Sequence, residues 1–132
     1  MGIEEFLIEP RRTPSAARVD LNGRWKNGLG SEMTLAVTSN GAVTGTYRTG
    51  VGLPSTAQEF PLTGYVERDL LAFVVNFGYY GSLAGWVGQH TVADGKERIE
   101  TLWHLARDVP EADESTMLWA CILAGANRFE RA

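Results

Sequence analysis

The chain has 132 residues, of which 44% are hydrophobic and 21% are charged, so it has the size and composition of one folded domain rather than of a disordered or fibrous chain. The net charge of −4 comes without a basic stripe, and no apolar run reaches the ~20 residues of a membrane span, so we expect neither nucleic acid nor a membrane as a partner. The 15 glycines favour tight turns and close backbone contacts, which points to an all-β fold.

The first part of the chain has the character of a tail. Residues 1–20 show neither a helical nor a strand period and contain Pro10 and Pro14, so we interpret them as a flexible segment ahead of a domain at 21–132. The first residues, MGIEEF, lack the positive and apolar regions of a signal peptide, which leaves the compartment open.

From Leu21 onward the sequence falls into short β-rich runs separated by turn residues, a rhythm typical of an antiparallel barrel or sandwich. Asn40-Gly41 and Asp94-Gly95 are strong hairpin signals. The connections at 49–59 and 107–115 are long, and such loops tend to lie at the mouth of a small barrel. The expected strands are 22–27, 33–39, 42–48, 60–65, 70–77, 82–90, 98–106 and 116–127.

Two of these runs, 70–75 and 117–126, do not alternate between apolar and polar residues. Because a strand that is apolar on both faces must be covered on both, we expect an oligomer with these strands in the interface. A locally apolar strand in a monomer is the alternative. Cys121, the only cysteine, lies in the second run and is interpreted as a small buried apolar residue.

Patterns of catalytic or metal-binding residues are missing from the sequence. The two histidines, His90 and His104, lie near strand ends without Cys or carboxylate partners at metal-ligand spacing, and no nucleophile elbow surrounds Ser31 or Ser82. We therefore expect a protein that is not an enzyme and that needs no metal or cofactor.

Aromatic residues are the remaining candidates for a site. An eight-stranded barrel can use such side chains as packed core or as the lining of a site for one small ligand, and the pattern alone leaves both open. The set consists of Trp25, Tyr47, Phe77, Trp86, Trp103 and Trp119.

Six local motifs, in order along residues 21–129, resemble those of the avidin and streptavidin family. Each is weak alone, but six in register across a domain are highly specific. The resemblance implies an eight-stranded antiparallel up-and-down β-barrel with its ligand site inside one end, and tight, non-catalytic binding of biotin. The motifs are GRWKNGLGS at 23–31, GTY at 45–47, LTG at 62–64, WVGQ at 86–89, TLW at 101–103 and GANRF at 125–129.

For the ureido group of biotin, the resemblance implies three donors and two acceptors. The side chains of Asn27, Ser31 and Tyr47 would donate to the ureido oxygen, and Thr49 and Asn127 would accept from its N–H groups. The residue at the place of Asn127 is an acid in streptavidin and an amide in other members, so here it would accept without charge assistance.

The rest of the implied site is apolar, apart from the mouth. Phe77 stands where streptavidin has the larger tryptophan, and Ala84 where it has a threonine facing the ring sulfur. The implied contacts are Phe77, Trp86 and Trp103 around the ring, Leu29, Val51, Ala84 and Leu105 at the sides, and Gly52, Leu53 and Ser82 at the carboxylate.

Trp119 bears on assembly. It precedes Asn127 by the spacing at which tetrameric members carry a tryptophan that covers the biotin of a neighbouring subunit, so a homotetramer is favoured over a dimer. Trp25 is left as a core residue. The resemblance also favours a secreted or periplasmic location. The alternative function is a lipocalin-like barrel for another small apolar ligand, which the polar residues expected at the base of the site disfavour.

Overall fold

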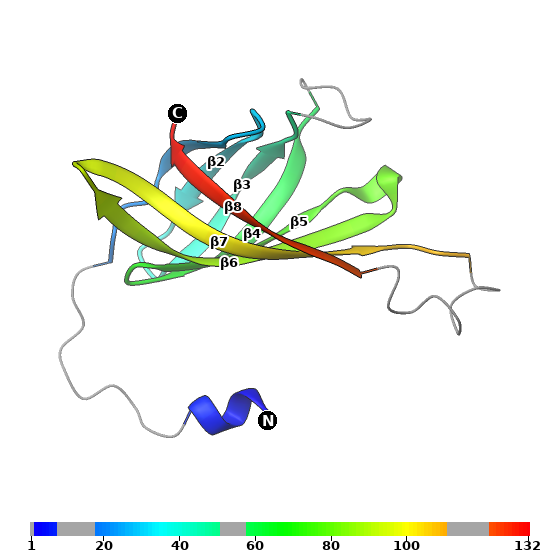
Figure 1. Ribbon diagram of the computed structural model, residues 1–132, viewed down its shortest axis with the longest axis horizontal. Coiled ribbons are helices and arrows are strands. Elements are labelled where there is room, and N and C mark those ends of the chain that lie inside the picture. The colour runs from blue at the N-terminus through cyan, green and yellow to red at the C-terminus, as the bar shows by residue number, and fades with distance from the viewer. Residues whose placement is uncertain (1, 8–17, 51–57, 111–121) are drawn as a thin grey trace.

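Eight strands form one closed barrel in the computed structural model, which describes residues 2–7, 18–50, 58–110 and 122–132 (Figure 1). Each strand pairs antiparallel with its neighbour in sequence, and β8 returns to β1, so the predicted up-and-down all-β barrel is confirmed. The strands are β1 (Gly23–Asn27), β2 (Glu32–Val37), β3 (Ala42–Arg48), β4 (Phe60–Glu67), β5 (Leu70–Asn76), β6 (Ser82–Ala93), β7 (Lys96–Arg107) and β8 (Ile122–Arg131).

The helical content of the described residues is limited to two short 3-10 turns, η1 (Ile3–Phe6) and η2 (Gly78–Tyr80). The second makes the β5–β6 connection and ends at Gly81, whose φ of 65° is left-handed. Within the described ranges, no helix is long and apolar enough to cross a membrane.

The connections divide between the two ends of the barrel, as up-and-down topology requires. The tight turns after β2, β4 and β6 lie at one end, and the connections after β1, β3, β5 and β7 lie at the other. Gly41 has a φ of 90°, and Asp94 and Gly95 have φ values of 53° and 75°, so both hairpin signals in the sequence correspond to turns with left-handed backbone.

The last strand ends later than the sequence pattern predicts. It was expected at 116–127, of which 116–121 lie outside the described residues, and it runs on to Arg131. Charged residues hide this extension from a search for apolar runs. Arg128 faces outward, with its Nε 2.5 Å from Glu100 Oε1. Phe129, between Arg128 and Glu130, points inward and is fully buried.

The hydrophobic core runs along the interior of the barrel from the end with the tight turns. Trp25 is fully buried there, and its Nε1 donates to the Leu21 carbonyl oxygen at 3.0 Å, so its assignment to the core is confirmed. The chain contacts the barrel before Leu21, since the Val19 N–H donates to the Arg68 carbonyl at 3.0 Å and Arg18 Nη1 donates to the Ser39 carbonyl at 2.7 Å.

Candidate ligand-binding site

The end of the barrel opposite the tight turns holds a cavity of about 250 Å³. Its walls come from strands β1, β3, β6, β7 and β8 and from the β1–β2, β3–β4 and β5–β6 connections. All of the lining residues belong to the set predicted from the sequence. They are Asn27, Leu29, Ser31, Tyr47, Thr49, Phe77, Ala84, Trp86, Trp103, Leu105 and Asn127.

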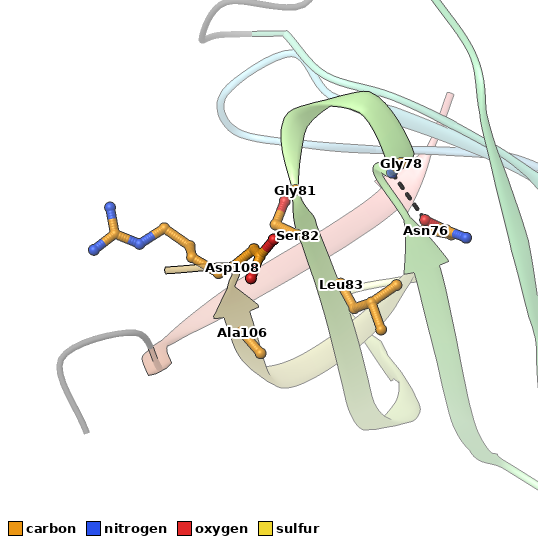
Figure 2. Close-up of a pocket in the computed structure, with 8 residues that line it drawn as sticks. Asn76, Gly78, Gly81, Ser82, Leu83, Ala106 and Asp108 are labelled. Atoms are coloured by element: carbon orange, nitrogen blue, oxygen red, sulfur yellow. Dashed lines mark hydrogen bonds between the residues drawn. The ribbon is translucent and has the colours of Figure 1, made fainter. Parts of the chain in front are cut away.

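Five predicted site residues are not part of this lining. Val51, Gly52, Leu53 and Trp119 lie outside the described residues. Ser82 lines a separate hollow of about 380 Å³ between the β5–β6 connection and the end of β7. Figure 2 shows Ser82 in this hollow, near Gly81 and Asp108. Ser82 is the first residue of β6, two residues before Ala84, and therefore lies beyond the end of the cavity.

The Asn27 side chain holds the loop that carries Ser31. Its Oδ1 accepts the backbone N–H groups of Leu29 and Ser31, both at 3.0 Å, although no charge is involved. Because this oxygen is occupied, the amide Nδ2 is the group left to donate into the cavity. Gly30, with a φ of 83°, completes the tight turn between them.

Ser31 and Tyr47 bring two hydroxyl groups to the same place. Ser31 Oγ accepts the Gly50 N–H at 2.9 Å, which leaves its own proton free to donate. Burial raises the pKa of the Tyr47 phenol, and hydrogen bonds with the Ser31 and Asn27 side chains partly oppose that rise. The Ser31 and Asn27 side chains therefore both lie within hydrogen-bond reach of the Tyr47 hydroxyl, at one end of the cavity.

Two acceptors lie on this lining as well. Thr49 Oγ1 is buried and has no hydrogen-bond partner among the residues that the structure describes, which is costly unless a ligand or water supplies one. Asn127 Oδ1 accepts the Trp86 indole N–H at 3.1 Å, and its backbone oxygen accepts from Thr101 Oγ1 at 2.9 Å. A carbonyl oxygen has two lone pairs, so Asn127 can accept a second hydrogen bond.

Aromatic stacking orients the cavity wall. Phe73 stacks on Trp86 with ring centroids 4.9 Å apart and planes 10° from parallel. Tyr47 also packs against Trp86, with ring centroids 5.1 Å apart and planes tilted by 36°. The sequence pattern does not single out Phe73. It is fully buried on β5, and its register partner on β6 is Trp86, a pairing that only the order of strands in the sheet reveals.

The chemistry of the cavity is that of binding. Tyr47 is the only titratable group among its lining residues, so the described lining offers no acid and base pair near neutral pH. His90 lies at the other end of the barrel, 3.0 Å from Glu97 Oε1 and in edge contact with Trp25. Among the described residues, no three His, Cys, Asp or Glu side chains gather as a metal site.

Comparisons with known proteins agree with this geometry. A sequence model described as the avidin family matches residues 15–132. Avidin of Gallus gallus is 35% identical over 126 residues, which cover 89% of this chain and 81% of that protein. Avidin-related protein 4/5 of Gallus gallus is 34% identical over 124 residues, with the same coverage.

Solved structures give the same result at the level of the fold. The crystal structure of xenavidin has a TM-score of 0.75 and 35% identity, and the match covers 88% of this chain and all (100%) of that one. The crystal structure of a rhizavidin–biotin complex has a TM-score of 0.72 and 27% identity, over 86% of this chain and 97% of that one.

Proposed function

The chain belongs to the avidin family, and from that premise we propose that it binds biotin inside the open end of its barrel. The family consists of binding proteins, so the chain is not an enzyme. The ligand enters and leaves chemically unchanged, and no cofactor takes part. The observation that carries the proposal is the convergence of Asn27, Ser31 and Tyr47 on one end of a largely apolar cavity.

Three donors at one place match the oxygen of a cyclic urea. Asn27 Nδ2 and the hydroxyl groups of Ser31 and Tyr47 donate to the ureido oxygen and draw negative charge onto it. Because the cavity lining is largely apolar, these hydrogen bonds act in a low dielectric and are stronger than in water. A fatty ligand has no group to satisfy them, which disfavours a lipocalin-like function.

The two ureido N–H groups need acceptors. Thr49 Oγ1, buried without a partner, accepts one of them, and the second lone pair of Asn127 Oδ1 accepts the other. The Trp86 indole N–H already holds the Asn127 oxygen in place, so little side-chain entropy is lost on binding.

The remainder of biotin lies among apolar side chains. The ring and the first part of the tail contact Phe77, Trp86 and Trp103, with Leu29, Ala84 and Leu105 beside them. The resemblance assigns Val51 to the side of the ring and tail, and the backbone near Gly52 and Leu53 to the carboxylate at the mouth. Ser82 reaches only a tail that extends past the cavity into the hollow of Figure 2.

Assembly covers the apolar outer face of β5 to β8. Val87 and Leu102 are direct neighbours on that face and are 66% and 65% exposed in the single chain. Leu70 and Val74 of β5 are 47% and 46% exposed on the same side. We propose a homotetramer in preference to a dimer, with Trp119 reaching the biotin of a neighbouring subunit.

Isothermal titration of the full chain with biotin tests the proposal, with pentanoic acid as the matched ligand that has the tail and lacks the cyclic urea. Saturation by biotin and no heat from pentanoic acid are expected. A protein that gives no saturation with biotin at micromolar concentration contradicts the function. Equal binding of both ligands contradicts the assignment of the polar end to the ureido group.

A further inference from the structure

A single row of residues crosses the inner face of the barrel at the level of the cavity. Gly64 of β4 pairs with Phe73, Phe73 with Trp86, Trp86 with Trp103, and Trp103 with Gly125 of β8. Facing Cβ atoms in such pairs are about 5 Å apart, and the Phe73 and Trp86 rings stack with their centroids 4.9 Å apart. The row has a glycine at each end, where the rings need space.

The two glycines differ in what a side chain would meet. A Cβ on Gly64 would lie 2.0 Å from the Ala72 carbonyl oxygen and 2.6 Å from Phe73 Cα, both of them backbone atoms. A Cβ on Gly125 would lie 2.5 Å from Cζ2, 2.7 Å from Cε2 and 2.9 Å from Nε1 of the Trp103 indole. The first contact constrains the sheet, whereas the second constrains one ring of the cavity wall.

We propose that Gly125 is a positioning residue for the ligand: without a side chain, it lets the Trp103 indole lie against the β8 backbone and keeps the cavity open. A methyl group at this position would push the ring off β8 and into the cavity of about 250 Å³ that Trp103 lines. The inference rests on the proposed function, because a narrower cavity changes function only if a ligand binds in it.

The proposal locates the effect of Gly125 in Trp103 and not in Asn127, its neighbour two residues along β8. The Asn127 side chain is held by Trp86, and its backbone oxygen by Thr101. These contacts do not involve the space above Gly125. A substitution that acts through the ring must therefore lose its effect once the ring is made smaller.

A double-mutant cycle in the full chain tests this dependence. The variants are Gly125→Ala, Trp103→Phe and the two combined, measured by titration with biotin and by near-ultraviolet circular dichroism. Gly28→Ala is the matched control, because a Cβ on Gly28 has no atom within 4 Å and its φ is not left-handed.

Gly125→Ala should weaken biotin binding at least about tenfold in the wild-type background and no more than about twofold in the Trp103→Phe background. Gly28→Ala should stay within about twofold of wild type. An unchanged affinity of Gly125→Ala, or an equal loss in both backgrounds, overturns the proposal. If Gly125→Ala alone does not fold, recovery of the fold in the double variant supports the ring contact, and failure to recover overturns it.

Circular dichroism separates this inference from the function on which it rests. If the wild type binds no biotin, the proposed function fails, while the aromatic spectrum still reports the setting of the indole. A spectral change on Gly125→Ala that disappears in the Trp103→Phe background supports the placement of the ring. The same change in both backgrounds, or no change in either, overturns it.

Discussion

The short polar side chain of Asn27, at the end of β1, has two roles. Its oxygen organises the turn to Ser31 through two backbone N–H groups, and this fixes the amide nitrogen as the donor toward the cavity. An aspartate could make the same turn but would present a negative charge to a ureido oxygen. The amide is therefore the side chain that suits both the loop and the proposed ligand.

Replacing Tyr47 by phenylalanine should weaken biotin binding by about 1–3 kcal/mol, since it removes one of three donors from a buried oxygen. The substitution keeps the aromatic ring, which lies 6.1 Å from the Phe77 ring and 5.1 Å from the Trp86 ring between centroids, so the packing around it is retained. The dissociation rate of biotin measures the loss. Tyr65→Phe is the control, because Tyr65 is 71% exposed. An unchanged dissociation rate in Tyr47→Phe contradicts a hydrogen bond from the Tyr47 hydroxyl to biotin.

Above neutral pH, the affinity for biotin should change only in strong alkali. Tyr47 is the one titratable residue of the described lining, and burial raises the pKa of its phenol above the usual 10.0. The neutral phenol donates to the ligand, so binding persists as pH rises and fails only when the phenol ionises. Titrations from neutral pH upward check this. A fall in affinity well below pH ~10 that persists in Tyr47→Phe contradicts it.

The sequence motifs predict which side chains line the cavity, but not how they hold each other. Asn127 and Trp86 come from strands that are not adjacent, and their hydrogen bond spans β7. The unpartnered hydroxyl of Thr49 is likewise a property of its surroundings. Such relations depend on side-chain positions in the closed barrel, which local patterns do not contain.

At the scale of the strands, the barrel closes through a short seam. β1 and β8 share three register pairs, from Trp25 with Arg131 to Asn27 with Phe129. Arg131 reinforces this seam: it lies 4.1 Å from the Trp25 ring centroid, and its Nη1 donates to the Asn22 carbonyl at 2.6 Å. Asn27 ends the same seam, so closure of the barrel also positions the first of the proposed ligand donors.

Acid should loosen this end of the barrel through Glu97. Hydrogen bonds from Arg131, at 2.8 Å, and from His90 hold the pKa of Glu97 below its usual 4.5. A carboxyl with a lower pKa in the folded state stabilises the fold above the unfolded pKa, and this stability is lost as pH falls through the folded pKa. The melting temperature of the wild type should therefore fall below pH ~4.5.

Glu97→Gln separates this carboxyl from the others. The variant should be less stable than wild type at neutral pH and should lose less on acidification, because the contribution of Glu97 is already gone. Glu59→Gln, at an exposed carboxyl just before β4, should keep the acid dependence of the wild type. An identical acid dependence in Glu97→Gln and wild type contradicts the role of Glu97.

Strand positions were predictable because turn residues and alternation are local. Both hairpin turns and the starts of β3, β4, β5 and β6 agree with the pattern. The end of β8 was not predictable in this way. Arg128 and Arg131 interrupt the apolar pattern, and the ion pairs that satisfy them come from β7, so only the folded sheet explains them.

At the scale of the whole molecule, the apolar outer face should control assembly. Leu102→Glu places a charge at the centre of that face and should dissociate the oligomer, since an unpaired charge is costly to bury. Val92→Glu is the matched control, because Val92 is 64% exposed, like Leu102, and lies at the far end of β6, next to the β6–β7 turn. Equal masses for both variants in native mass spectrometry contradict an interface on this face.

The apolar run at 70–75 predicts this face, and the structure explains why apolar and polar residues do not alternate in it. The inward residues of β5 are buried, while Leu70 and Val74 on the outside are equally apolar and half-exposed in the single chain. The number of subunits does not follow from one strand. It depends on contacts between copies, and Trp119, the residue expected to cross the interface, lies outside the described residues.

Native mass spectrometry of the full chain, with and without biotin, tests the central claim most directly, because it reports the ligand and the number of subunits together. The account predicts one biotin for each chain, bound to an oligomer, with all sites filled at a modest excess of ligand. Spectra in which saturating biotin adds no mass to any species would contradict it.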